Sequence, residues 1–265
     1  MPTSTDKSVY VLGSGASMLA LSAAERLFLQ TQTTVAMNKY LLFWDIIGLW
    51  PTHFFLADIH YPALRVYEES VAIAAAHGRP PRFLLDRQFR LRYSENTFRR
   101  LLNRRFAREQ LHRYGFTPNP AARPAEATYF RRTHGWDSPE RWATSLREKL
   151  YFYRGSLSVL LNLLTILNLG KHIKLLGVDL GSPGSFYDDR LAERPYLMDD
   201  YLRLQQSGAV QQHMTAAEFK GMPGIQAKWP FIQRSVEAAG FRLSCCNPES
   251  LLVKEGLCPY APVIE

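Results

Sequence analysis

A strand, a turn and the start of a helix follow one another in Val9-Tyr10-Val11-Leu12-Gly13-Ser14-Gly15-Ala16-Ser17. The four apolar residues predict a buried strand, the glycines predict a tight turn, and Ser17 is a candidate N-cap for the helix. Free amide groups in such a turn, together with the helix dipole, favour the binding of a phosphate. The stretch therefore predicts an α/β protein with a phosphate site at Gly13, Ser14, Gly15 and Ser17.

Two departures separate this turn from a dinucleotide-binding fingerprint. Met18 stands where the fingerprint has a third small residue, and the second strand, Thr33–Met37, is followed by Asn38 rather than by an acidic residue. An amide can hydrogen-bond a sugar or a base, but it does not select NAD. We therefore expect a phosphorylated nucleotide other than NAD, with Asn38 among the residues that bind it.

The composition is that of a folded domain without a membrane anchor. The chain has 265 residues, 46% of them hydrophobic, which predicts a single domain over residues 1–265. Its longest apolar run, Leu157–Leu169, is too short to span a bilayer, and the N-terminus lacks the pattern of a signal peptide. Cys245, Cys246 and Cys258 lack the number and spacing of a disulfide framework or a zinc site. We expect a cytoplasmic protein with free thiols.

Apolar runs alternate with helical patterns along most of the chain, which is typical of a doubly wound, mostly parallel sheet of Rossmann-like type. The predicted strands are Val9–Leu12, Thr33–Met37, His53–Ala57, Arg82–Leu85, His172–Leu176 and Phe241–Ser244. The predicted helices are Leu19–Leu29, Tyr61–Ala76, Leu157–Leu169 and Lys228–Ala239, and Gly170 and Gly240 are predicted to end the last two. Two segments fall outside the pattern. They are a basic insertion at about 90–140, interpreted as a helix over Glu95–His112 and a loop, and a lid-like segment at about 187–225.

Small or polar residues follow most of the predicted strands. They are Gly13-Ser14-Gly15, Asn38, Asp58, Gly177-Val178-Asp179 and Asn247-Pro248. Ligands of open α/β sheets bind beyond the carboxyl ends of the strands, so these residues share one edge. Any one of them alone would be an ordinary turn residue. Together they predict a crevice in which Asn38, Asp58, Gly177 and Asp179 contact the ligand.

Positive charge is concentrated in one part of the chain. The net charge is +8 and the pI is about 9.5, and much of the excess comes from the arginines between Arg82 and Arg132. Nucleic acid, anionic lipid or an acidic saccharide would each suit such a surface. A solvated helical face accounts for the charge equally well, so the sequence leaves both interpretations open.

Several other residues carry groups suited to catalysis or anion binding. Tyr187 can donate a hydrogen bond to a phosphate oxygen, although an aromatic that anchors the loop has the same pattern. His213 can take a proton from an acceptor hydroxyl near neutral pH, or it is an ordinary surface histidine. Arg154 can clamp a phosphate or carboxylate, and Ser156 or Ser158 can reach the same group or cap the helix that follows.

Metal ligands have no clear pattern in the sequence. Asp188-Asp189 and Asp199-Asp200 are direct neighbours, so their side chains diverge, and no His/Glu cluster has transition-metal spacing. We therefore expect no metal site, no cofactor and a transfer reaction that proceeds without a metal ion.

The order of these motifs resembles the bacterial sialyltransferases of glycosyltransferase family 42, which decorate lipooligosaccharide. The resemblance rests on Gly13-Ser14-Gly15-Ala16-Ser17 after the first strand, on Asn38 after the second, and on Ile173-Lys174-Leu175-Leu176-Gly177-Val178-Asp179. Ser185-Phe186-Tyr187 and Asn247-Pro248-Glu249-Ser250-Leu251-Leu252 extend it toward the C-terminus. The similarity covers about half of the chain and leaves out the arginine-rich segment.

The resemblance implies a GT-A-like variant of the Rossmann-like sheet with a lid, and a CMP-sialic acid donor that is cleaved with inversion and without metal. It implies that Gly13, Ser14 and Gly15 hold the CMP phosphate, that Tyr187 binds the departing phosphate, and that His213 is the general base. The chain departs from the family at Ser14 and Asp58, where the family has Asn, and at Gly181, where the family has a phosphate-binding Tyr. These departures also suit another CMP-activated nonulosonic or ulosonic acid.

The partners expected on this basis are a CMP-activated sugar and a saccharide or glycolipid acceptor, and no nucleic acid. Peripheral contact with an anionic inner-membrane surface and homo-oligomer formation stay open. Two other functions also stay open. One is a flagellin-type nonulosonate transferase or a pterin diphosphokinase-like enzyme, and the other is a non-catalytic, basic nucleotide-binding module at an anionic membrane.

Overall fold

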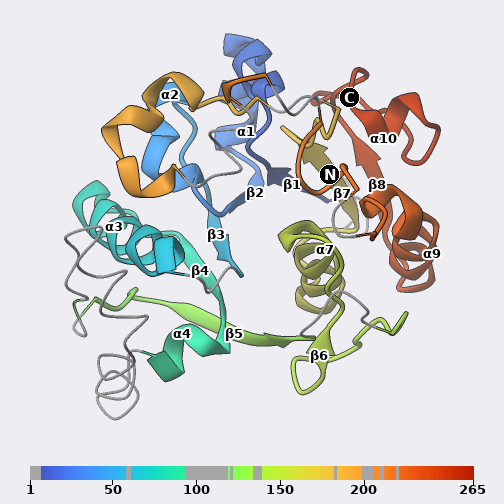
Figure 1. The fold of residues 1–265 in the computed structure, drawn as a ribbon, viewed down its shortest axis with the longest axis horizontal. Coiled ribbons are helices and arrows are strands. Elements are labelled where there is room, and N and C mark those ends of the chain that lie inside the picture. The colour runs from blue at the N-terminus through green and yellow to red at the C-terminus, as the bar shows by residue number, and fades with distance from the viewer. Residues whose placement is uncertain are drawn as a thin grey trace.

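The chain folds around one sheet of eight parallel strands in the order β6-β5-β4-β3-β2-β1-β7-β8 (Figure 1). The computed structural model describes residues 7–57, 61–92, 119, 122–133, 139–181, 184–198, 206–208, 212–218 and 221–265. The strands are β1 (Ser8–Leu12), β2 (Thr33–Met37), β3 (His53–Leu56), β4 (Arg82–Asp86), β5 (Ala127–Arg132), β6 (Lys149–Leu150), β7 (His172–Leu176) and β8 (Arg242–Cys245). This sheet confirms the predicted α/β, doubly wound, Rossmann-like class.

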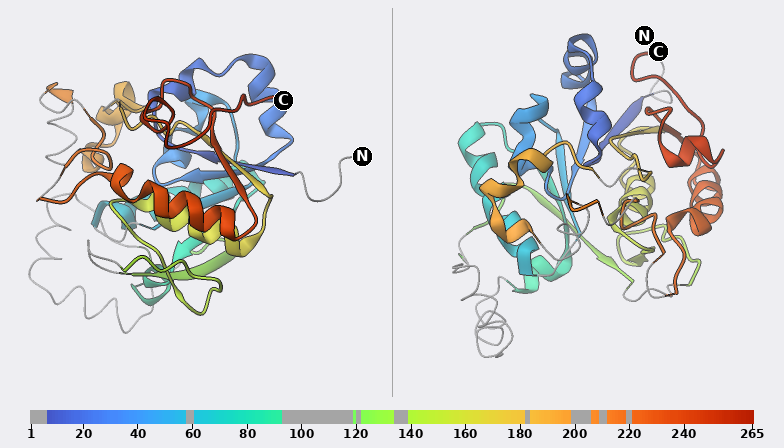
Figure 2. Two further views of the ribbon diagram at one scale, coloured as in Figure 1. Left: turned by 90° about the vertical axis from the view of Figure 1, so that its right-hand side faces the viewer. Right: turned by 45° about the horizontal axis from the view of Figure 1, so that its top comes forward.

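Helices cover both faces of the sheet, and alternate strand residues point to opposite faces. Val9 and Val11 join the core under α7 (Ser156–Leu167) and α9 (Trp229–Ala238), which lie side by side (Figure 2). Tyr10 and Leu12 join the core on the other face, under η3 (Tyr40–Phe43), α2 (Trp44–Ile47) and α3 (Tyr61–His77). Each large apolar side chain that is fully buried contributes about 1.5–3 kcal/mol, so these two cores hold the sheet together.

The remaining elements are short or lie at the rim. They are η2 (Ala16–Ala20), α1 (Ala23–Gln30), α4 (Arg87–Arg92), η4 (Asp188–Glu193), η5 (Pro195–Leu197), η6 (Ile225–Lys228) and α10 (Leu251–Lys254). In the part of the chain that the structure describes, no helix combines the length and apolar character needed to cross a membrane.

The helix predicted at Leu19–Leu29 is two elements, and its predicted cap is wrong. The chain makes the 3-10 turn η2 first, and α1 begins after Ser22. The Ser22 hydroxyl accepts the Glu25 amide at 3.2 Å, and the Glu25 carboxylate accepts the Ser22 amide at 2.8 Å. Such a reciprocal pair is a capping box. Ser22, three residues before a glutamate, is therefore the cap, and Ser17 is not.

Glycines were predicted to end two helices, and the structure confirms one of these ends and not the other. Gly240 follows α9 with φ +80°, as predicted for a glycine that ends a helix. The end predicted at Gly170 is wrong, because Asn168 takes the left-handed conformation there with φ +52°. Gly170 is needed for another reason, since a Cβ on it would lie 2.6 Å from the carbonyl oxygen of Lys7.

Strand β5 lies where a loop was predicted in the basic insertion, and β6, which follows the insertion, was not predicted. Phe130 of β5 packs in the core and pairs with Asp86 of β4, while Arg131 and Arg132 end the strand. The helix predicted over Glu95–His112 lies outside the described residues.

The first part of the predicted lid-like segment is docked on the body of the fold, beside α2 and α3 (Figure 1). Arg190 forms an ion pair with Asp45, and Arg194 forms one with Glu69 at 3.2 Å. Tyr196 is buried in the core on the same face. Residues 184–198 therefore belong to the packed domain.

Candidate functional site

The candidate site lies where the strand order reverses. From β1 the chain adds β2 to β6 on one side of the sheet, and β7 and β8 on the other. Leu12 of β1 pairs with Leu176 of β7, so the turns that begin at Gly13 and Gly177 leave the sheet next to each other. Ligands of open α/β sheets bind at such a switch point.

Close packing of these two turns explains their glycines. A Cβ on Gly13 would lie 2.3 Å from the carbonyl oxygen of Gly177, and one on Gly15 would lie 2.4 Å from Oδ2 of Asp179. Gly177 has φ +63°, and a Cβ there would lie 2.6 Å from Cγ of Met18. Met18 therefore fills the space under the β7 turn.

The predicted phosphate seat on the β1 turn needs a correction. The amide of Gly13 donates to the Leu176 carbonyl at 2.8 Å, and the amide of Gly15 donates to the Gly177 carbonyl at 2.7 Å. The amide of Ser17 donates to the Asp179 carboxylate at 2.9 Å. These three amides are thus occupied by the β7 turn and are not free for a phosphate.

Asp179 joins three parts of the chain at this edge. Its carboxylate accepts hydrogen bonds from the Ser17 amide, the Ser17 hydroxyl and the Asn247 side-chain amide, the last at 2.8 Å. Its carbonyl accepts the Leu251 amide at 2.9 Å, at the start of α10. Asp179 lies at the site as predicted, but its carboxylate is occupied by the protein. Its observed contacts hold β1, β7 and the C-terminal segment together.

His213 is fixed beside the β7 turn. Its amide donates to the Leu180 carbonyl at 3.2 Å, and its Nδ1 accepts the Thr215 amide at 3.2 Å. Burial, and then the charge of Lys39, lower the pKa of His213 to about 4, although Asp179 acts in the opposite direction. The imidazole is therefore neutral at pH 7. Since Nδ1 accepts a hydrogen bond, the neutral ring carries its proton on Nε2.

Arg154 holds the turn that carries His213. Its guanidinium donates to the carbonyls of Met214, at 2.8 Å, and Ala217. Arg154 is buried and has φ +57°, just before α7. One nitrogen of the guanidinium thus binds protein carbonyls, and the predicted role of Arg154 as a phosphate clamp stays a prediction. It positions the His213 turn.

The serines that follow Arg154 are buried. The Ser158 hydroxyl accepts the Tyr153 amide at 2.9 Å and donates to the Gly155 carbonyl at 3.2 Å. Gly155 is the N-cap residue of α7, and no side chain caps that helix end, so the capping predicted for Ser156 or Ser158 is wrong. Both side chains lie inside the fold behind the His213 turn.

Asn38 offers an acceptor at the end of β2. Its backbone has φ +53°, a left-handed conformation that asparagine tolerates better than most residues. Its amide donates to the Phe55 carbonyl at 2.8 Å, while its side-chain Oδ1 is buried and bonds to no residue that the structure describes. A buried acceptor without a partner is costly unless a ligand or water satisfies it. Asp58, predicted beside it, lies outside the described residues.

Tyr187 closes the site over the end of β2. Its ring stacks on Phe43 with centroids 4.7 Å apart, and the Ser14 carbonyl accepts the neighbouring Phe186 amide at 2.9 Å. Packing thus explains the position of the Tyr187 ring, and its role toward a phosphate stays a prediction. Asp188 accepts the Ser185 amide at 2.9 Å, and burial raises the pKa of its carboxyl.

Lys39 is the residue that sequence reasoning missed. Its charge lowers the pKa of His213 and opposes the raised pKa of the Asp188 carboxyl. The only signal in the sequence was its place directly after Asn38. The structure places Asn38 and Lys39 directly after β2, and Asp179, Asp188 and His213 in the segments that follow β7.

Among the residues described, no three His, Cys, Asp or Glu side chains form a group that could hold a metal ion. Comparisons of this chain with protein-family models, with curated proteins and with solved structures find no match. The functional argument therefore rests on the site itself.

Proposed function

We propose that this chain is a glycosyltransferase that moves a sialic acid, or a related nonulosonic or ulosonic acid, from a CMP-activated donor to a saccharide hydroxyl. The reaction inverts the anomeric carbon and needs no metal ion. The observation that carries the proposal is the buried, unsatisfied Oδ1 of Asn38 at the end of β2, the strand next to β1 in the sheet. This position is where open α/β proteins bind nucleotides. The charge of Lys39, the next residue, acts on His213.

Asn38 and Lys39 supply what a CMP-sugar needs for binding. The free Oδ1 of Asn38 can accept a hydrogen bond from an amino group of the base or from a ribose hydroxyl. The ammonium of Lys39 can pair with the phosphate or with the carboxylate of the sugar. Lys39 therefore takes the role that was predicted for the amides of the β1 turn.

His213 is the proposed base. The acceptor oxygen bonds to the anomeric carbon while the bond from that carbon to the CMP phosphate breaks, and CMP leaves with the electron pair. The hydroxyl proton passes to the imidazole of His213. This step requires the ring to present an unprotonated nitrogen, so Nδ1 must release the Thr215 amide or the proton must leave Nε2. A bound donor favours the change, because its phosphate and carboxylate raise the pKa of a nearby histidine.

Nucleotide-dependent stabilisation tests the donor assignment. CMP and CDP should raise the melting temperature more than ADP and GDP do. A nucleotide at 100 times its dissociation constant stabilises by about 2.7 kcal/mol. Asn38→Gly keeps the left-handed backbone and removes the acceptor, so it should weaken CMP binding about tenfold. Asn168→Gly is the matched control, because Asn168 is also left-handed but lies at the end of α7.

Two results would contradict this assignment. Equal or greater stabilisation by ADP or GDP would remove the cytidine nucleotide, and unchanged CMP binding by Asn38→Gly would remove Asn38 from the site. Donor cleavage should also survive EDTA. An absolute need for magnesium would favour a diphosphokinase instead, and no cleavage of any CMP-sugar would favour a binding module.

A further inference from the structure

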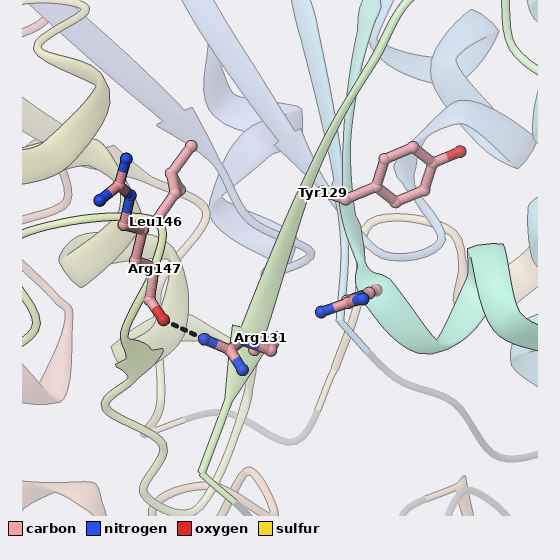
Figure 3. Close-up of a pocket in the computed structure, with 5 residues that line it drawn as sticks. Tyr129, Arg131, Leu146 and Arg147 are labelled. Atoms are coloured by element: carbon pink, nitrogen blue, oxygen red, sulfur yellow. Dashed lines mark hydrogen bonds between the residues drawn. The ribbon is translucent and has the colours of Figure 1, made fainter.

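A second polar cavity lies away from the switch point, at the carboxyl ends of β4 and β5. It has a volume of about 340 Å³ and is lined by Arg87, Tyr129, Arg131, Leu146 and Arg147 (Figure 3). Four strand spacings separate β5 from β1, which is about 20 Å across the sheet. One nucleotide at the switch point therefore does not fill it.

Three separate elements bring the arginines of this cavity together. Arg87 opens α4 directly after β4, and Arg131 extends from β5 on the same face as Tyr129. Arg147 comes from the turn before β6, and its carbonyl accepts a hydrogen bond from the Arg131 guanidinium (Figure 3). That bond fixes one guanidinium at the cavity wall before any ligand arrives.

The turn that carries Arg147 is itself rigid. One carboxylate oxygen of Glu148 accepts the amide and the hydroxyl of Thr144 at 3.1 and 3.0 Å, and also the Ser145 hydroxyl at 3.2 Å. Its other oxygen accepts the Arg141 guanidinium at 3.2 Å. These bonds hold the pKa of Glu148 below its usual range. The wall of the cavity is therefore preorganised.

The carboxylates nearest in the sequence are engaged elsewhere. Asp86 pairs with Arg132 at 3.2 Å on the opposite face of β5, and Glu126 pairs with Arg82. None of the three cavity guanidinium groups has an ion pair with a carboxylate of the described residues. Guanidinium groups without a carboxylate partner favour the binding of an anion in the cavity that they line.

We propose that this cavity is a second anion site that binds a phosphate group, carried either by a soluble phosphorylated molecule or by a lipid headgroup. Guanidinium groups bind phosphate oxygens in pairs, so Arg87 and Arg131 match a doubly charged phosphate. Arg147 contributes its carbonyl to the cavity wall, and its guanidinium points away from Arg131 (Figure 3). Tyr129 and Leu146 add apolar surface for the body of the molecule that carries the phosphate. The site is separate from the proposed donor site and does not depend on it.

Titration with inorganic pyrophosphate, followed by calorimetry, tests the soluble source. We expect wild type to bind it, and we expect Arg131→Gln and Arg87→Gln each to weaken that binding about tenfold or more. Arg87→Gln removes no bond to a described residue, so it separates lost binding from lost folding. Arg79→Gln is the control, because Arg79 is exposed in the loop before β4, at the opposite edge of the sheet. Stabilisation by CMP should be the same in all three variants.

Sedimentation with vesicles of phosphatidylglycerol and phosphatidylcholine in equal amounts tests the lipid source. Binding to these vesicles that falls in Arg87→Gln but not in Arg79→Gln supports the phosphate site with a lipid as its source. Vesicles of phosphatidylcholine alone should not bind. The proposal is overturned if wild type binds neither pyrophosphate nor anionic vesicles, or if Arg87→Gln and Arg131→Gln bind both as well as wild type does.

Discussion

Two polar regions of the molecule differ in whether their polar groups already have partners in the protein. One is the pair of turns after β1 and β7, and the other is the arginine cavity at β4 and β5. In the turns, the amides of Gly13, Gly15 and Ser17 all donate to the neighbouring turn. In the cavity, the guanidinium groups of Arg87 and Arg131 form no ion pair with a carboxylate of the described residues. The glycine signature therefore reflects close backbone packing here. The groups open to a ligand are those that the fold leaves unsatisfied, such as Oδ1 of Asn38.

The largest expected effect is on turnover. His213→Ala should lower the rate of transfer by about 10²–10⁴-fold, because a general base typically contributes that much. CMP stabilisation should stay near wild type, since the base contacts the acceptor. Gln212→Ala changes the exposed neighbour and serves as the control. If His213→Ala keeps nearly full activity, the base is another residue.

A pair of glycine variants tests whether the turns are a packing device. In Gly15→Ala the new Cβ meets Oδ2 of Asp179 at 2.4 Å, so we expect a loss of about 1–3 kcal/mol in the free energy of unfolding. In Gly181→Ala the nearest atom is 3.7 Å away, and the change should stay within about 0.5 kcal/mol. Denaturant unfolding of both variants measures the difference. Equal stabilities would show that the turns are not held as tightly as the contacts indicate.

The smallest expected effect is a change in the pH dependence of stability. The pKa of His213 is about 4 in the folded state, below the usual 6.5, so protons bind the unfolded chain more readily. Its stabilising contribution is complete above pH 6.5 and is lost as pH falls from 6.5 toward 4. His213→Gln should therefore reduce the slope of stability against pH in this range, by at most about 1.4 kcal/mol per pH unit.

Two other histidines act in the same direction and set the background for this measurement. Burial also lowers the pKa values of His53 and His172 to about 4. These two histidines should therefore lower the stability of both wild type and His213→Gln between pH 6.5 and 5. A slope that is identical in wild type and His213→Gln would mean that His213 is exposed to solvent in the folded state.

The edge strand β8 was predictable, as were the strands from β4 to β7 across the sheet, whereas β5 and β6 at the other edge were not. Buried, largely apolar runs mark β1, β2, β3 and β7 because both faces of these strands lie under helices, although β7 also contains His172 and Lys174. β5 ends in two arginines and β6 has only two residues, so neither gives such a run. The residues of the candidate site show a similar difference. Those at strand ends were predictable, and the contacts made by residues in loops were not.

Residues at strand ends were found because the strand itself marks the edge of the sheet. Asn38 and Asp179 were placed correctly on that basis. Which groups stay open to a ligand depends on partners distant in the sequence. The sequence predicts a ligand clamp at Arg154, and it gives no sign that the guanidinium donates to carbonyls 60 and 63 residues away. Spacing along the chain carries no signal for such contacts.

The place of β1 between β2 and β7 in the sheet has a consequence for synthesis on the ribosome. β1 can pair with β2 almost at once, but Leu12 meets Leu176 only after much of the chain has been made. At typical translation speeds that interval lasts about ten seconds or more. Throughout it, one hydrogen-bonding edge of β1 is uncovered, and such an edge is prone to pair with another chain. The nascent protein is therefore expected to depend most on chaperones before β7 emerges.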